Sequence, residues 1–209
     1  MEELDNIEIT RQTYDKNAAS HAEAHWDASF WTEDEEKFES YLSSGAKILD
    51  VGCGSGRDTK HFMERGYDVV GIDFSSGQIA EARKRVPNGN FLIMDMRDLK
   101  FDPESFDGLW CCSSLLHFRR DEIPSTLSSL NQVLRKDGVI FISLRKREDM
   151  EEWRKYPDGT ARFFSYYDDA GEFKTMLEES GFSVMDYNLK SMTKDSAPYD
   201  WHCYYARKS

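Results

Sequence analysis

Several features that mark secreted, membrane-spanning or nucleic-acid-binding proteins are missing from this sequence. Its apolar runs fall well short of the roughly 18 residues that a helix needs to cross a bilayer. The first residues, MEELDNIEIT, contain neither the cationic nor the apolar region of a signal peptide. We therefore expect a soluble, cytoplasmic protein with no membrane partner.

Cysteine is scarce, and its spacing does not suit a structural role. The four cysteines, Cys53, Cys111, Cys112 and Cys203, form no C-x-x-C pair and no pattern of metal ligands. They indicate neither a zinc site nor a disulfide framework. We expect free, mostly buried thiols and no bound metal.

An excess of positive charge is also missing. The chain has 27 Lys and Arg against 39 Asp and Glu, which gives a net charge of −12. This is the wrong sign for a default attraction to nucleic-acid phosphates or anionic membranes, although a local basic patch is compatible with it. Nucleic acid is therefore an unfavoured partner.

A regular apolar rhythm begins only at Lys47. A chain of 209 residues fits one domain, or one domain with a small lid, and can bury a sizeable core. The first 45 residues are polar and aromatic and lack that rhythm. We predict an N-terminal helical cap over residues 1–45 and a core over residues 46–209.

Within the core, strand and helix patterns alternate. Apolar runs predict strands at 47–51, 67–73, 90–95, 105–114 and 139–146. Helical patterns fall between most of them, at 57–66, 75–86 and 120–138. Strands joined in this way favour right-handed crossovers and a mostly parallel sheet with helices on both faces. The sequence predicts a doubly wound α/β domain.

Three glycines at alternate positions, Gly52, Gly54 and Gly56, directly follow the first predicted strand. In a doubly wound sheet the ligand lies beyond the carboxyl ends of the strands, where the strand order reverses. Glycine lets the chain turn tightly there and lets backbone amides face a polar or anionic ligand. The alternative is a plain glycine-rich turn.

Carboxylates end the second and third predicted strands. Asp73 lies 21 residues after Gly52, where it can accept hydrogen bonds from both hydroxyls of a ribose. Asp95 ends the next strand, near the place of a base. The alternatives are an N-cap for the helix that begins near Ser75 and an ordinary loop carboxylate at Asp95. We favour a ligand that contains a nucleoside.

A dinucleotide fits less well, because Arg57 stands where G-x-G-x-x-G needs its third glycine. Five segments instead resemble, in order and spacing, the motifs of class I S-adenosylmethionine-dependent methyltransferases: ILDVGCGSGRDT, VVGIDFS, FLIMDMRDL, SFDGLWCCSSLLHF and LRKDGVIFISL. They lie within residues 47–144. The resemblance implies a Rossmann-like sheet of seven strands with the last one antiparallel. It also implies a helix at 170–182 and strands at 183–190 and 201–208.

The same resemblance implies S-adenosyl-L-methionine as cofactor and S-adenosyl-L-homocysteine as product. Gly52, Cys53 and Gly54 then lie along the methionine part of the cofactor, and Asp73 holds the ribose. Arg57 pairs with the cofactor carboxylate, or else is a solvated arginine in the first turn of a helix.

The adenine and the sulfonium are assigned by the same resemblance. Phe74 packs on the adenine ring, and Asp95 and Met96 frame its amino edge. Cys112 and Ser113, at the end of the fourth strand, match the backbone positions nearest the sulfonium.

The segment YDKNAASHAEAHW resembles the cap of small-molecule members of this family, in which a tyrosine reaches over the methionine end. Here that residue is Tyr14. The alternative is that Tyr14, Trp26 and Trp31 only pack a helical cap onto the sheet. Both interpretations can hold, because a cap that buries aromatic rings also excludes water from the site.

A sulfonium is already an activated methyl donor, so the protein mainly aligns the acceptor and excludes water. If the acceptor loses a proton, His117 is the expected base, with Tyr14 as a second catalytic residue. A packed or helix-capping histidine is the alternative. Trp201 and His202 can also face the cleft, although an ordinary strand start is favoured there.

The resemblance implies that the acceptor is chosen by variable segments, here about 1–45, 146–168 and 189–201. The segment 146–168, a predicted lid, combines arginines with aromatics, which suits a flat or anionic molecule or simply a solvated lid. We expect methyl transfer to an O, N or S atom of a small or medium-sized metabolite. The alternatives are a tRNA methyltransferase of the wobble-uridine type, which the run RFFSYYDDAGEFKTMLEESGF also resembles, a non-catalytic cofactor-binding protein and an NAD-dependent oxidoreductase. The sequence decides neither the acceptor atom nor the oligomeric state.

Overall fold

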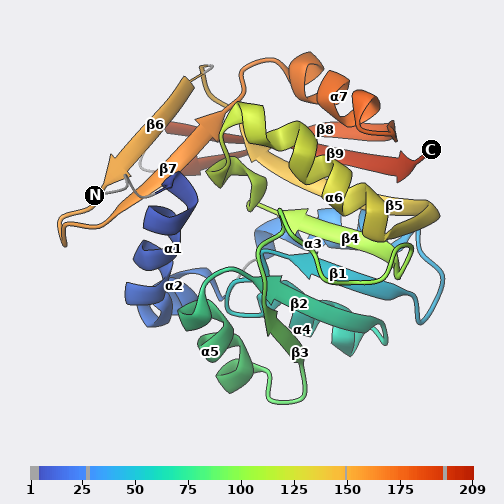
Figure 1. Ribbon diagram of the computed structural model, residues 1–209, viewed down its shortest axis with the longest axis horizontal. Helices are drawn as coiled ribbons and strands as arrows, with labels where there is room; N and C mark the ends of the chain where they lie inside the picture. The colour runs from blue at the N-terminus through green and yellow to red at the C-terminus, as the bar shows by residue number, and fades with distance from the viewer. Residues whose placement is uncertain (1–4, 27–28, 149, 195–196) are drawn as a thin grey trace.

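The computed structural model describes residues 5–26, 29–148, 150–194 and 197–209. A seven-stranded sheet in the order β3-β2-β1-β4-β5-β9-β8 forms its centre (Figure 1). The first five strands in this order, from β3 through β2, β1 and β4 to β5, are parallel to one another. Strand β9 runs antiparallel to β5 and to β8. The predicted sheet with an antiparallel last strand is confirmed. The strands are β1 (Lys47–Val51), β2 (Asp68–Asp73), β3 (Asn90–Ile93), β4 (Phe106–Cys112), β5 (Leu134–Arg145), β8 (Phe182–Lys194) and β9 (Ala197–Lys208).

Helices cover both faces of the sheet. Figure 1 shows α6 and α7 on the viewer's side of the sheet and α3 behind it. Phe38 of α3 and Phe62 of α4 pack on Trp110 in β4, whereas Phe173 of α7 packs on Tyr204 in β9. The α-helices are α1 (Asn6–Lys16), α2 (Ala18–His25), α3 (Thr32–Glu39), α4 (Arg57–Glu64), α5 (Ser76–Arg85), α6 (Ile123–Val133) and α7 (Ala170–Glu179). Short 3₁₀ turns lie at Ser29–Trp31, Leu115–His117 and Arg120–Glu122.

The central strands are buried on both faces, which explains their nearly continuous apolar sequence. Trp110 in β4 is fully buried, and its ring stacks on Phe141 of β5 with the centroids 4.0 Å apart. Aromatic pairs of this kind contribute about 0.5–1.5 kcal/mol beyond the area that they bury. The packing fixes β4 and β5 relative to each other.

The predicted helix at 120–138 is wrong at both ends. A 3₁₀ turn occupies Arg120–Glu122, α6 ends at Val133, and β5 begins at Leu134. Leu134 pairs with Phe106 of β4, and both side chains are fully buried. Because the side chain of Leu134 is buried beside β4, it continues the sheet rather than the helix. The helical pattern in LRKDG is overridden by this tertiary contact.

Helix α1 is tied to the core through the start of α5. Asp15 Oδ1 accepts hydrogen bonds from the Gly77 amide (2.8 Å) and the Ser75 hydroxyl (2.7 Å). A Cβ on Gly77 would lie only 2.8 Å from the carbonyl oxygen of Asp15. The close approach of the two helices therefore requires glycine at this position.

A two-stranded hairpin outside the main sheet, β6 (Met150–Lys155) with β7 (Ala161–Tyr166), packs beside α1. The hydroxyl of Thr13 donates to the Ala161 carbonyl (2.6 Å), and the hydroxyl of Thr10 accepts from the Phe163 amide (3.1 Å). Two threonines one turn apart on α1 thus satisfy the free edge of β7. The helix and the hairpin form one continuous wall.

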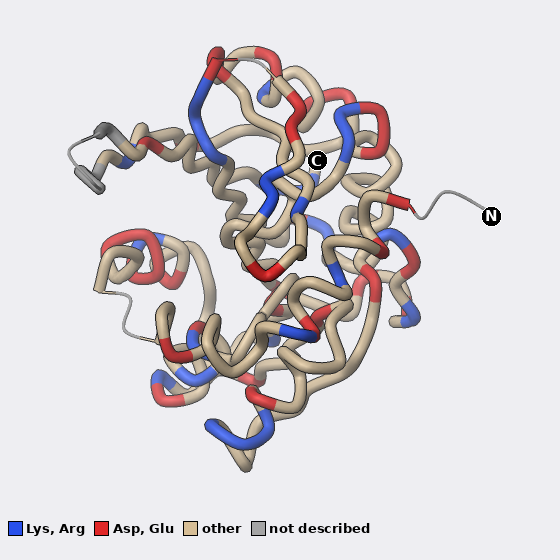
Figure 2. Tube along the Cα trace, turned by 90° about the vertical axis from the view of Figure 1, so that its left-hand side faces the viewer, with Lys and Arg blue, Asp and Glu red and all other residues tan. Residues whose placement is uncertain are grey.

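Charged residues are mixed over the described surface. Figure 2 shows Lys and Arg positions interspersed with Asp and Glu positions. Among the residues that the structure describes, no helix has both the length and the apolar character that crossing a bilayer requires. The four cysteines are free, and Cys53, Cys111 and Cys203 are buried, as expected.

Candidate functional site

One cavity of about 600 Å³ opens beyond the carboxyl ends of β1, β2 and β4. This is the edge at which a doubly wound sheet binds its ligand. Each residue that the sequence nominated as catalytic or cofactor-binding lines this cavity: Tyr14, Gly52, Cys53, Gly54, Arg57, Asp73, Phe74, Asp95, Met96, Cys112, Ser113 and His117. The structure thus brings the nominated residues together.

The glycine loop is shaped by its own backbone contacts. Gly52 has a φ of +77°, and a Cβ there would lie 2.5 Å from Cβ of Ser114. The amides of Gly52 and Cys53 donate to the Ile72 carbonyl (2.8 and 2.9 Å), and the Gly54 amide donates to Asp73 Oδ2 (3.0 Å). The expectation that amides of the glycine loop face a ligand is wrong for these three, because protein acceptors already occupy them. The glycines instead allow a close approach of the chain.

Asp73 ends β2 beneath this loop, with 6% of its surface exposed. Besides the Gly54 amide, it accepts from the Ser75 amide at 2.8 Å. Burial raises the pKa of Asp73 to about 6, against the opposing effect of these two hydrogen bonds. Ser75 is the N-cap of α5 and accepts from the Gln78 amide, so the alternative that Asp73 caps this helix is wrong.

Asp95, beside Met96, lies in the loop after β3, because this strand ends at Ile93 and not at Asp95 as predicted. Asp95 forms an ion pair with Arg97 (2.7 Å) and also accepts from the Arg97 amide (2.9 Å). Arg97 also forms an ion pair with Glu122, with Nη1 3.1 Å from Oε1. The Asp95 carboxylate is therefore held in place by its own loop, and it still lines the cavity.

Arg57 begins α4 and contacts the carboxylate of Asp58 through Nε (2.5 Å) and Nη2 (2.9 Å). Its Nη1 donates to the His25 carbonyl at 3.2 Å. Asp58 also accepts from the indole of Trp110 (2.9 Å). The alternative of a solvated arginine is wrong, since Arg57 is an anchored cation at the cavity wall.

Tyr14, His117 and Arg162 form a hydrogen-bonded chain. His117 Nδ1 lies 2.7 Å from the Phe163 carbonyl, which can only accept, so the proton of the neutral ring is on Nδ1. The hydroxyl of Tyr14 therefore donates to Nε2 (2.8 Å), and Arg162 donates to the Tyr14 oxygen (2.8 Å). Burial, with Arg162 adding to it, lowers the pKa of His117 to about 3.

His117 is 5% exposed, and both of its ring nitrogens have partners. These contacts match the packed histidine that the sequence left as an alternative. The ring also lines the cavity, as the site prediction required. Tyr14 likewise packs, edge to face, on the Phe74 ring at 6.1 Å while lining the cavity.

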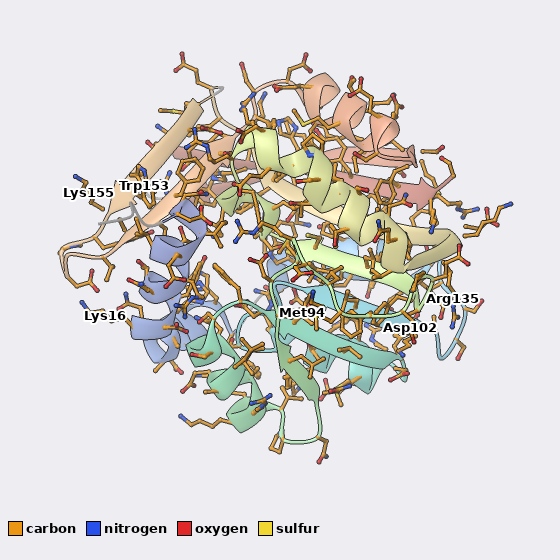
Figure 3. All side chains as sticks on the ribbon, in the orientation of Figure 1. Lys16, Met94, Asp102, Arg135, Trp153 and Lys155 are labelled. Atoms are coloured by element: carbon orange, nitrogen blue, oxygen red, sulfur yellow. The ribbon has the colours of Figure 1, made fainter. Side chains whose placement is uncertain are left out.

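Several residues of the cavity wall were not nominated from the sequence. They come from α2, the first 3₁₀ turn, α5, the hairpin and β9, and include His21, Phe30, Trp31, Gln78, Arg154, Arg162, Phe164 and Tyr199. In Figure 3 the hairpin that carries Trp153 and Lys155 lies across the molecule from Arg135. For the hairpin residues Arg154, Arg162 and Phe164, the sequence signal was the combination of arginines and aromatics in 146–168.

Trp201 lines the cavity, but His202 does not. His202 points to the other face of β9, where its ring nitrogens lie 2.8 Å from the Tyr187 hydroxyl and 3.1 Å from the Tyr167 carbonyl. Successive residues of a strand alternate between its faces, so only one of the two can face the cavity. Within the described part of the chain, no cluster of three His, Cys, Asp or Glu residues has metal-binding geometry.

Comparisons with known proteins agree with this geometry. The family profile described as a methyltransferase domain matches residues 48–138. A putative methyltransferase from Bacillus subtilis, YqeM, is 29% identical over 127 residues, covering 58% of this chain and 51% of its own. The O-methyltransferase cnsE from Penicillium expansum is 32% identical over 158 residues, covering 69% and 54%. This chain thus spans about half the length of these curated relatives.

A solved structure with the same fold is that of 1,6-didemethyltoxoflavin-N1-methyltransferase from Burkholderia thailandensis, with bound 1,6-didemethyltoxoflavin and S-adenosylhomocysteine. Its TM-score against this chain is 0.77, with 20% sequence identity, and the match covers 97% of this chain and 88% of the other. At that identity the likeness establishes the fold.

Proposed function

We propose that this chain, which belongs to the class I S-adenosylmethionine-dependent methyltransferases, moves a methyl group from S-adenosyl-L-methionine to an O, N or S atom of a small or medium-sized metabolite. The observation that carries the proposal is the buried Asp73 carboxylate, held by the glycine loop at the mouth of a cavity on the carboxyl edge of the sheet. The product is S-adenosyl-L-homocysteine.

The polar groups of the cavity fit this cofactor. Both side-chain polar atoms of Gln78, Oε1 and Nε2, are buried without a hydrogen-bond partner in the described residues, and Gln78 lines the cavity beside Gly54. Buried polar atoms without partners are rare in native proteins and call for an explanation. Asp73 is likewise poorly solvated. A polar ligand whose hydroxyl groups donate to Asp73 and Gln78 Oε1 and accept from Gln78 Nε2 would satisfy both residues.

The cofactor would be held by the nominated residues in the roles that the family resemblance gives them. Asp73 would accept from the ribose hydroxyls, Phe74 and Met96 would flank the adenine, and Asp95 would accept from its amino group. The loop from Gly52 to Gly54 would pass along the methionine part without crowding it. Arg57 would contribute its charge to the cofactor carboxylate. Residues 1–45 and 146–168 would act as cap and lid.

When bound, the cofactor supplies a methyl group on a sulfonium, which needs no further activation. The protein's task is to align the acceptor and exclude water. The cap and hairpin wall exclude water. Tyr14 would reach over the methionine end of the cofactor, with its hydroxyl hydrogen directed to His117 and its oxygen held by Arg162.

His117 is better suited to positioning Tyr14 than to acting as a general base. A pKa of about 3, set by burial, leaves the imidazole neutral, and its free lone pair is already used by Tyr14. A general base works best when its pKa lies near the operating pH. We therefore assign His117 the role of orienting Tyr14, which lines the cavity.

The test is transfer of label from [methyl-³H]S-adenosylmethionine to a fractionated metabolite extract, with heat-denatured protein as control. Label in a low-molecular-weight product supports the proposal. Label that appears only in added tRNA would support the RNA alternative, which the net charge of −12 does not favour. Tight cofactor binding without transfer to any fraction would support a non-catalytic cofactor-binding protein.

A further inference from the structure

The hairpin places two arginines directly opposite each other on the cavity side. Arg154 and Arg162 are register partners in the antiparallel pair of β6 and β7, and both line the cavity. Like charges directly opposite in a sheet destabilise it. An arrangement that opposes folding in this way, at the wall of a cavity, indicates a use for the two cations.

Arg162 is mostly buried, yet its side-chain partners are neutral. Its Nη1 donates to the Tyr14 hydroxyl (2.8 Å), and its Nε donates to the Tyr156 hydroxyl (2.7 Å), which also accepts from Nη2. Among the described residues, no carboxylate forms an ion pair with it. A buried guanidinium normally has an anionic partner.

Arg154 has one carboxylate contact, from Nε to Glu152 (3.0 Å), and Glu152 is shared with Arg147 (2.9 Å). Its two terminal nitrogens make no hydrogen bond with the described part of the chain. The terminal nitrogens are the ones that grip an oxyanion in a bidentate pair. They are therefore left for a ligand.

Arg145 adds a third cation behind this wall. It is 7% exposed, its Nη1 donates to the Asp200 carbonyl (3.0 Å), and its Nε is buried without a partner in the described residues. Its guanidinium lies over the rings of Tyr199 and Trp201, which line the cavity. Burial, with the charge of Arg154 adding to it, lowers the pKa of Arg145.

The rest of this half of the cavity is aromatic. The rings come from the 3₁₀ turn, β7 and β9: Phe30, Trp31, Phe164, Tyr199 and Trp201. Trp31 and Trp201 meet edge to face at 5.4 Å, and Arg162 lies 5.4 Å from the centre of the Phe164 ring. Flat walls of this kind favour a flat ligand.

We infer that the methyl acceptor is a flat aromatic molecule that carries a carboxylate, gripped by Arg154 and Arg162 while its ring lies between Phe164 and the β9 aromatics. This inference rests on the proposed function, because it assumes that the ligand bound in this half of the cavity receives the methyl group. It explains why a chain with a net charge of −12 leaves Arg162 without a carboxylate partner among the described residues, and pairs Arg154 with Glu152 only through Nε. The carboxylates of the cavity, Asp58, Asp73 and Asp95, belong to the glycine-loop half.

The test compares 2-naphthoate with 2-naphthamide, which share a ring system and differ in charge. Calorimetric titration of the protein loaded with S-adenosylhomocysteine should give at least about tenfold tighter binding of the carboxylate. In Arg162→Gln and Arg154→Gln the preference should fall below about threefold, whereas Arg162→Lys should retain part of it. Arg135→Gln is the matched control, because Arg135 is half exposed and pairs with Asp107 away from the cavity.

Equal binding of acid and amide, or no binding of the acid, overturns the inference. So does an Arg162→Gln protein that keeps the preference. If Arg162→Gln weakens S-adenosylhomocysteine as much as 2-naphthoate, the arginine serves the cofactor carboxylate and the inference is again overturned. Repeating the titrations without S-adenosylhomocysteine separates the two proposals. A parent that shows the charge preference but binds no S-adenosylhomocysteine contradicts the proposed function and leaves the anion site intact.

Discussion

The two halves of the cavity are built in different ways. Around Gly52 and Asp73, the wall is made of loops that directly follow parallel strands, and main-chain amides hold it together. Around Arg162, the wall combines the cap, the hairpin and β9, and side-chain hydrogen bonds and ring contacts hold it together. The first half presents three carboxylates and Arg57, whereas the second presents Arg154 and Arg162 and no carboxylate among the described lining residues.

This difference indicates a division of labour. Main-chain hydrogen bonds fix the glycine-loop half in one shape, which suits a ligand that never changes. Side-chain contacts between distant segments can be altered by substitution without disturbing the sheet, which suits a ligand that differs from one protein to the next. Damage to the first half should therefore affect cofactor binding, and damage to the second half should affect the acceptor.

The largest effect is expected for Gly52→Ala. The new Cβ would stand 2.5 Å from Cβ of Ser114, at a φ of +77° that alanine adopts only with strain. The loop must move, so binding of S-adenosylhomocysteine should weaken about 100-fold or more. Gly45→Ala is the matched control: its φ is +74°, but nothing lies within 4 Å of the new Cβ. Equal loss of affinity in both variants would mean that the contact with Ser114 does not matter.

Asp73→Ala should come next. It removes the acceptors proposed for the ribose and frees the Gly54 amide, which should cost about 1–3 kcal/mol of binding free energy for S-adenosylhomocysteine. Asp68→Ala, at the exposed start of the same strand, is the control. Calorimetry measures both. Parental affinity in folded Asp73→Ala would remove this residue from the cofactor site.

Tyr14→Phe tests the boundary between the two halves. It removes the hydroxyl that links His117 to Arg162, so methyl transfer should slow about 30-fold while the affinity for S-adenosylhomocysteine changes less than about threefold. Tyr156→Phe, which takes one neutral partner from Arg162 but none from His117, is the comparison. The rate of methyl transfer should depend on pH between 6 and 7 in the same way in the parent and in His117→Gln, because burial lowers the pKa of His117 to about 3. An ionisation in this range that the parent shows and His117→Gln lacks would make His117 the base.

The smallest effect is a pH dependence of cofactor binding. Burial raises the pKa of Asp73 from 3.8 to about 6 in the ligand-free protein, so the protonated form is favoured below that pH. Ribose hydroxyls bind the ionised form, so affinity for S-adenosylhomocysteine should rise about tenfold from pH 5 to pH 7. Asp73→Asn should lose this dependence. An unchanged slope in Asp73→Asn would assign it to another group.

The sequence predicted one half of the cavity far better than the other. Gly52, Asp73, Asp95 and Cys112 lie at or just after strand ends, and the strand order alone brings them together. Arg162 and Tyr199 come from a hairpin and an antiparallel strand whose placement depends on tertiary packing. Their side chains face the cavity because of contacts with Tyr14 and Arg145, which no local pattern records.

The errors have similar causes. The helix predicted to run to Gly138 ends at Val133, because Leu134 is buried beside β4. The amides of Gly52 and Cys53, expected to face a ligand, donate to the Ile72 carbonyl. In both cases a contact between neighbouring strands decided between two locally acceptable conformations.

Calorimetric titration of the parent protein with S-adenosylhomocysteine, with NADH as control, tests the central claim most directly. The account predicts binding at about micromolar strength or tighter, one ligand per chain, and none for NADH. Folded protein that does not bind S-adenosylhomocysteine, or that binds NADH equally well, would contradict this account.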